Sequence, residues 1–250
     1  MSRESRRRAI ERLRKQETRR RRRRQLIGAA GGLIVAGGIA AAIVAATAGA
    51  AAGGPPPAKL AALSTLGTLR PAPARGPDGS EGVPVPQAPL LASTATSAHG
   101  QTVDSIGCST GEQTLFHIHV HLTLFVNGTP RQVPAGIGIP GAVATQTQAG
   151  PFISSGSCFY WLHTHAPDGI IHIESPLHRT YTLGEFFDEW GQPLGPGQVG
   201  PASGHVTAIY NGEVYRGNPR DIPLTRHAQI QLEVGTPLIT PESITFPAGL

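Results

Sequence analysis

Six of the ten histidines lie in two short motifs whose spacing suits metal coordination. The first motif contains His117, His119 and His121, which alternate with Ile118 and Val120. In a β-strand this alternation places all three imidazoles on one face, roughly 6.5–7 Å apart along the strand. Neighbouring imidazoles at that separation can converge on one ion, so the motif predicts a metal-binding strand.

The second motif, residues 162–174, has a Pro-Asp-Gly turn signal at its centre. A two-residue turn at Asp-Gly pairs His165 with His172, whereas a four-residue loop pairs His163 with His172. Both loops have even length, so either register leaves the same side chains on one face. The motif therefore presents three imidazoles and one carboxylate together, from His163, His165, His172 and Glu174.

These ligand types restrict the choice of metal. The only methionine is Met1, so a thioether ligand is absent from the rest of the chain. A Cu(I) or blue-copper site is therefore disfavoured, and imidazole with carboxylate suits Cu(II), Zn(II) or non-haem iron. Of these we expect copper or zinc. The alternative is a solvated polar face that responds to pH through its histidines.

The elements that carry these motifs are predicted from period-2 alternation and turn signals between residues 105 and 250. One helix interrupts the strands, because Thr182 and Glu185 have capping-box spacing and Gly191 supplies a stop. We expect a mostly β domain with one short helix, either a β-sandwich or a β-grasp-like unit. The expected strands are 115–126, 158–165, 170–174, 205–210, 213–216 and 228–234.

The N-terminal region predicts a membrane anchor. Residues 1–25 hold 13 of the 21 Lys and Arg with three acids, and the remaining residues are net acidic. Residues 26–52 contain no charged residue, and about 20 apolar residues span a bilayer. The positive-inside rule then places the tail in the cytoplasm and the C-terminal domain outside. A cleaved signal peptide and a twin-arginine export signal are the alternatives.

Residues 53–104 contain nine prolines and no periodic apolar pattern. This composition predicts a disordered linker between the anchor and the folded domain. Cys108 and Cys158 follow it, and on this topology both lie outside the cytoplasm, where disulfides persist. We expect a Cys108–Cys158 disulfide, with a pair of thiolate ligands as the alternative.

A resemblance joins several of these segments. The His-x-His motif at residue 117, the segments 162–165 and 169–176, and the helix segment 182–191 resemble a set of uncharacterised membrane-anchored bacterial and archaeal proteins. The resemblance covers about residues 108–246 and implies a fold unit without an activity. The His-x-His followed by a later His and Glu is superficially similar to a cupin site, but the cupin glycine spacing is absent.

Three classes of function fit these observations. The leading hypothesis is a binding module that holds, buffers or delivers a metal at the outer face of the membrane. The second is a metal-dependent enzyme with an open coordination position, although no nucleophile elbow or phosphate loop accompanies it. The third is an interaction domain with a pH-responsive histidine face. The expected partners are the membrane and a metal ion, not nucleic acid, because the basic charge is confined to the tail; the sequence names no protein partner.

Overall fold

The structure is a computed structural model, and it describes residues 60–250. The predicted tail and anchor, and the first residues of the predicted linker, lie outside this range. Within it, no helix has both the length and the apolar character needed to cross a membrane.

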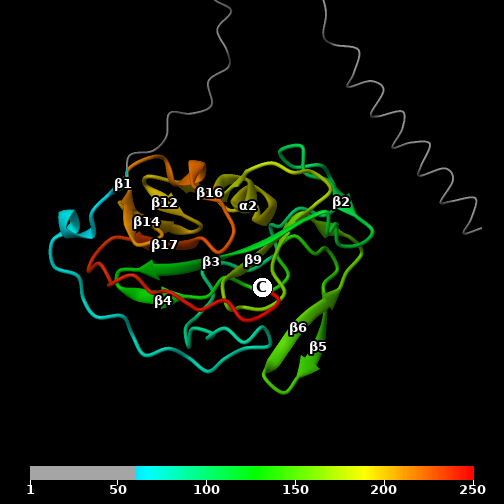
Figure 1. The fold of residues 1–250 in the computed structure, drawn as a ribbon, viewed down its shortest axis with the longest axis horizontal. Helices are drawn as coiled ribbons and strands as arrows, with labels where there is room; N and C mark the ends of the chain where they lie inside the picture. Colours follow the sequence, from blue (N-terminus) through cyan, green and yellow to red (C-terminus); the bar gives the residue numbers. More distant parts are fainter. Residues whose placement is uncertain (1–59) are drawn as a thin grey trace, which may run out of the picture. The chain divides into compact units, whose positions relative to one another are not determined.

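A mixed sheet of eight strands forms the centre of the domain (Figure 1). Its order is β1-β15-β14-β17-β3-β9-β8, and β4 pairs with β3 beside this path. β3 and β17 are parallel, and all other neighbours in the sheet are antiparallel. The strands are β1 (Leu60–Ala61), β3 (Phe116–Val126), β4 (Thr129–Arg131), β8 (Leu162–His163), β9 (Ile170–Ser175), β14 (Val206–Tyr210), β15 (Glu213–Tyr215) and β17 (Gln229–Val234).

Two Asn-Gly turns confirm the predicted hairpins. Asn127 and Gly128 have φ of 50° and 72°, and they connect β3 to β4. Asn211 and Gly212 have φ of 51° and 82°, and they connect β14 to β15. Positive φ at both central residues is the type I′ geometry, whose twist matches that of the flanking strands.

Helix α2 (Leu183–Trp190) confirms the predicted helix and its caps. The Thr182 backbone N–H donates to Glu185 Oε2 at 2.8 Å, and Glu185 N–H donates to Thr182 Oγ1 at 3.4 Å. These two bonds satisfy amides that the first helical turn leaves free. At the other end, Gly191 ends the helix in the left-handed conformation, with φ of 67°.

The remaining elements are short. The predicted strand over residues 158–165 is broken, because Trp161 separates β7 from β8. The hairpin of β5 and β6 was not predicted, and it projects from the body of the domain (Figure 1). These elements are η1 (Leu63–Leu66), β2 (Cys108–Ser109), β5 (Val143–Thr147), β6 (Gly150–Ser155), β7 (Phe159–Tyr160), β10 (Tyr181–Thr182), β11 (Leu194–Gly195), β12 (Gln198–Val199), β13 (Ala202–Ser203), η2 (Pro219–Asp221) and β16 (Pro223–Leu224).

The hydrophobic core lies between the apolar face of the central strands and helix α2. From β3 it takes alternate residues, among them Val120 and Leu122, and from α2 it takes Phe186, Phe187 and Trp190. All three aromatic side chains are fully buried. The alternation in β3 therefore directs its apolar residues to the helix and its histidines to the opposite face.

This opposite, polar face is buried as well. His119 is 2% exposed, and Gln231 and Glu233 of β17 are 2% and 1% exposed. C-terminal residues 239–244 contribute backbone groups that hydrogen-bond the polar side chains of β17. All the histidines of this face except His117 are consequently held inside the protein, where an unpaired polar group is costly.

Residues 60–104 correct the prediction of a disordered linker. This segment has little regular structure, but it packs along the domain (Figure 1). Val83 is fully buried and Leu91 is 7% exposed. Backbone bonds attach the segment at several points, including Arg70 N–H to the Leu238 carbonyl at 2.8 Å and Ala98 N–H to the Glu189 carbonyl at 2.8 Å. Low hydrophobicity overall did not prevent order here, because the segment buries individual apolar side chains and bonds its backbone to the domain.

The predicted disulfide is present. Cys108 on β2 is bonded to Cys158, just before β7, with 5.5 Å between the Cα atoms. β2 pairs with β7, so the bond reinforces a contact between segments 50 residues apart. Neither thiol is therefore free to act as a metal ligand.

Candidate metal centre

Three adjacent strands position the histidines. His163 on β8 is opposite His172 on β9, and His172 is opposite His119 on β3. Two residues along, in the next pair on the same face of β9 and β3, Glu174 is opposite His117. The pairing of His163 with His172 is the register of the four-residue loop, one of the two that the sequence allowed. Because paired residues point to the same face, these side chains meet on one side of the sheet.

The first group contains His117, His119, His172 and Glu174, whose ligand atoms all lie within 4.8 Å of one another. The Nε2 atoms of His117 and His119 are 3.0 Å apart, and His117 Nε2 is 3.1 Å from Glu174 Oε1. Two nitrogens bound to one tetrahedral ion at about 2.0–2.1 Å are about 3.3–3.4 Å apart, close to these distances. The spacing of these atoms therefore matches that of ligands to a shared ion.

The second group contains His163, His165 and His172, again within 4.8 Å of one another. The Nε2 atoms of His163 and His165 are 3.1 Å apart. His163 Nδ1 is 2.8 Å from the Tyr160 carbonyl, and His165 Nδ1 contacts the Ile153 carbonyl. A carbonyl requires a donor, so Nδ1 carries the proton in both rings and Nε2 keeps its lone pair for a ligand bond.

Two carboxylates that were not predicted from the sequence join the cluster. Glu81 Oε1 is 2.7 Å from His172 Nε2, and the Glu81 side chain is only 4% exposed. Glu112 Oε1 is 3.6 Å from His165 Nε2, and Glu112 also forms a group with His163 and Glu174. Glu112 lies just before β3, where no sequence pattern indicated a metal ligand.

A tight turn presents Glu81 to the cluster. Gly79 N–H donates to the Val83 carbonyl at 2.8 Å, and Val85 N–H donates to the Pro77 carbonyl at 2.9 Å. The turn is anchored by Val83, which is fully buried. The only signal in the sequence was that Glu81 is one of three acidic residues between positions 53 and 104.

Burial determines the protonation of most of these imidazoles. Desolvation, with the nearby His172 and His117, lowers the pKa of His119 to about 3. Desolvation and His172 also lower the pKa of His163 and the pKa of His165. These rings are consequently neutral near pH 7, which is the form that binds a metal.

His172 behaves in the opposite way. Burial by itself lowers the pKa of His172, but the carboxylates of Glu174 and Glu81 outweigh that effect and raise it to about 9. Without a metal, His172 is therefore an imidazolium between two carboxylates. A metal ion that binds this ring must displace its proton.

Several polar atoms of the cluster have no hydrogen-bond partner. Among residues 60–250, nine buried side-chain nitrogen or oxygen atoms are unpartnered, and four belong to this cluster. Leaving such an atom unsatisfied costs about 1–3 kcal/mol. A bound cation would compensate that cost by coordinating some of these atoms, or by moving their side chains so that the other atoms gain partners. The four atoms are Glu81 Oε2, His119 Nδ1, His172 Nδ1 and Glu174 Oε2.

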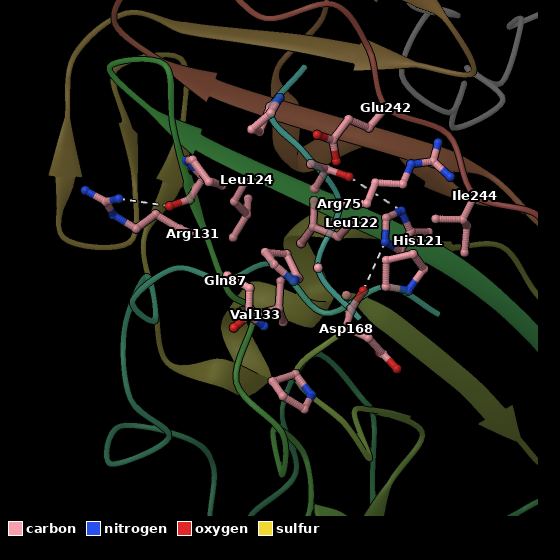
Figure 2. Close-up of a pocket in the computed structure, with 18 of the residues that line it drawn as sticks. Arg75, Gln87, His121, Leu122, Leu124, Arg131, Val133, Asp168, Glu242 and Ile244 are labelled. Carbon is pink, nitrogen blue, oxygen red and sulfur yellow. Dashed lines mark hydrogen bonds between the residues drawn. The ribbon is translucent and has the colours of Figure 1, made fainter. Parts of the chain in front are cut away.

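His121 does not join either group, contrary to the prediction. It is opposite Ile170 in the β3–β9 pairing, so no ligand faces it across the strands. Its Nε2 is 3.0 Å from the Asp168 carbonyl, which therefore accepts a hydrogen bond from the ring. Figure 2 shows His121 in a separate pocket with Arg75 and Glu242 beside it. Desolvation lowers the pKa of His121 to about 4.

Asp168 lies between this pocket and the cluster. Its Oδ1 accepts a hydrogen bond from Ile170 N–H at 3.1 Å, as expected of a turn residue. Burial and the charge of Glu81 raise the pKa of Asp168 to about 7. The four remaining histidines, His99, His178, His205 and His227, are exposed and belong to no ligand group.

The chain has no match among protein-family models, curated proteins or solved structures.

Proposed function

We propose that this chain is a membrane-anchored protein whose extracytoplasmic domain binds a transition metal, copper or zinc. The observation that carries the proposal is the convergence of five histidines and one glutamate, from three neighbouring strands and, for His165, from the bend that follows β8. Within each of the two groups the ligand atoms lie within 4.8 Å of one another, and His119, His172 and Glu174 each have a buried atom without a hydrogen-bond partner. A solvated histidine face would be exposed and would not leave polar atoms unsatisfied.

The donor set supports a transition metal such as copper or zinc over magnesium, calcium and a soft-ligand Cu(I) site. Imidazole nitrogen dominates, and carboxylate oxygen completes the set, which suits Cu(II) and Zn(II). Both cysteines are consumed by the disulfide, and no methionine lies among residues 60–250, so a soft-ligand Cu(I) site has no donors there. Magnesium and calcium are disfavoured because they prefer all-oxygen ligation.

The strand order supports a β-grasp-like interpretation over a sandwich. Five neighbouring strands of the sheet have the spatial order β9-β3-β17-β14-β15. Along the chain, β3 is the first of these five and β17 is the last, and in the sheet the two are adjacent and parallel. Helix α2 lies between the second and third strands in sequence and packs on one face. This arrangement leaves the other face available for the metal cluster.

Metal analysis of the purified full-length chain in detergent tests the proposal. The protein would be stripped with a chelator, reloaded with Zn(II) or Cu(II), and dialysed before the metal is counted. We expect at least one equivalent in the wild type, and at least one equivalent fewer in a His163→Ala/His165→Ala variant. A matched His178→Ala/His205→Ala variant, which removes exposed histidines, should bind as the wild type does. Less than one equivalent in the wild type would contradict the proposal.

The membrane orientation is tested separately. The concentration of 13 of the 21 Lys and Arg in residues 1–25, directly before an uncharged stretch of 27 residues, supports an N-terminus inside the cell. A reporter fused after Leu250 should be active only outside the cytoplasm, and the full-length chain should remain in the membrane fraction after an alkaline wash. A reporter active in the cytoplasm would overturn the orientation.

A further inference from the structure

The two ligand groups that contain more than one histidine share His172 but otherwise use different histidines, and a third group joins His163 to Glu112 and Glu174. No group among residues 60–250 contains both the His117–His119 pair and the His163–His165 pair. Ligands bound to one ion at about 2.0–2.2 Å cannot be more than about 4.4 Å apart. The two pairs therefore match two ions better than one.

His172 lies between the two pairs. Its ring is 4.6 Å from the ring of His119 and 4.6 Å from the ring of His165, and it meets both edge-on. The pairing of β9 with β3 on one side and with β8 on the other produces this position. A central imidazole is thus within reach of both pairs.

The two ring nitrogens of His172 face different carboxylates. Nδ1 is 3.7 Å from Glu174 Oε1, the carboxylate of the first group. Nε2 is 2.7 Å from Glu81 Oε1. Glu81 belongs to neither ligand group, but its carboxylate lies at the ring nitrogen that does not face Glu174. Each ring nitrogen of His172 therefore has a different carboxylate beside it.

We propose that the cluster holds two metal ions and that His172 bridges them as an imidazolate. Nδ1 binds the ion held by His117, His119 and Glu174, and Nε2 binds the ion held by His163, His165 and Glu81. The inference rests on the proposed function, because it divides the same ligands into two sites.

The donor count is consistent with this division. Each ion receives three nitrogens and one carboxylate oxygen, a four-coordinate set that suits Zn(II) or Cu(II). One ring proton of His172 leaves to solvent as each ion binds, so both have left once the second ion is bound. Glu81 Oε1, which accepts a hydrogen bond from Nε2–H without metal, then loses that donor and becomes a ligand. The unpartnered atoms His172 Nδ1, Glu174 Oε2 and Glu81 Oε2 all lie at these two sites.

A Cu(II) titration of the full-length chain tests the bridge by stoichiometry and electron paramagnetic resonance. We expect the wild type to retain two equivalents after dialysis. The signal should grow with the first equivalent and fall by at least half as the second binds, because an imidazolate couples the two unpaired spins. His117→Ala/His119→Ala and His163→Ala/His165→Ala should each retain one equivalent with an undiminished signal per copper. Circular dichroism of the metal-free variants would establish that they fold.

The possible outcomes separate this inference from the proposed function. One equivalent in the wild type, lost in both double variants, would overturn the two-ion centre and leave a single metal site. Two equivalents with a fully additive signal would overturn the bridge. No retained metal in the wild type would overturn both proposals. The wild-type measurements do not depend on whether any variant folds, and His178→Ala/His205→Ala controls for copper bound at exposed histidines.

Discussion

Two patches on the same buried polar face of the sheet differ in how their polar groups are satisfied. On β17, both oxygens of Glu233 accept hydrogen bonds, from Gln231 Nε2 at 3.0 Å and from Ile239 N–H at 2.8 Å. Gln229 makes two bonds with the backbone of Ile244. On β3 and β9, by contrast, His119, His172 and Glu174 each retain a buried atom without a partner.

The difference distinguishes a structural polar patch from a ligand-binding one. The C-terminal segment supplies a backbone group for each polar side chain of β17, so that patch stabilises the fold. The histidine cluster receives carboxylates instead, from Glu81 and Glu112. Carboxylates increase the affinity of a site for a cation. They only accept hydrogen bonds, so they cannot donate one to the lone pair of a neutral imidazole nitrogen. The comparison therefore supports the cluster as the metal site, and it leads to four predictions.

The largest expected effect is on the pH dependence of the metal-free protein. The pKa of His172 rises from 6.5 to about 9 on folding, so its contribution to stability is complete below pH 6.5 and is lost as pH rises through 9. At 1.36 kcal/mol per unit the loss is on the order of 3 kcal/mol. His119, with a pKa of about 3, acts in the opposite direction and only below pH 6.5. Denaturation of the chelator-treated chain between pH 6 and 10 measures this loss.

A His172→Gln variant is the control for that measurement. It lacks the titrating ring, so its stability should vary much less between pH 6.5 and 9. Parallel loss of stability in the variant and the wild type would show that another group is responsible.

Next in size is the effect of removing one ligand. His119→Ala should weaken Zn(II) binding by on the order of 100-fold, because losing even an outer-shell partner of a ligand costs 10–100-fold. His121→Ala is the matched control, since it removes an equally buried imidazole from the same strand. Competition with a chromogenic chelator measures both affinities. If both variants bound Zn(II) equally weakly, His121 would contribute to the site as His119 does, and its assignment to a separate pocket would be wrong.

A substitution in the β17 patch should change the stability of the fold and not the binding of metal. Gln231→Leu leaves Glu242 N–H without its acceptor at 2.9 Å, and an unsatisfied buried donor costs about 1–3 kcal/mol. We expect that loss in the free energy of unfolding, with the number of bound metal ions unchanged. Tryptophan fluorescence follows unfolding, because both tryptophans are buried in this domain. A loss of metal in this variant would remove the contrast between the patches.

The smallest effect should come from the segment that was predicted to be disordered. Glu81→Gln removes one charge from the cluster and should weaken metal binding by about 10-fold. Asp78→Asn, an exposed position in the same turn, should leave the affinity unchanged. If the two variants bind equally well, Glu81 has no part in the site.

Much of the local structure could be predicted. Alternation over residues 115–126, the Asn-Gly turns and the capping box at Thr182 each depend on neighbours in the sequence, and the structure has a strand, two hairpins and a helix at these places. Hairpin parity also placed His163 and His172 on one face, and it left the choice of register open. The errors concern the segment 60–104 and His121, both of which depend on contacts between distant parts of the chain.

The sequence by itself determined that the motif histidines and Glu174 share a face within each strand, because side-chain direction follows from the two-residue period of a strand. Only the tertiary structure decided which strands are adjacent, and therefore that His119 meets His172 while His121 meets a carbonyl group. It also decided that Glu81 reaches the cluster from a segment with no periodic pattern. Strand order and the packing of an irregular segment depend on contacts that local patterns do not encode, which is why these features emerged only in the folded chain.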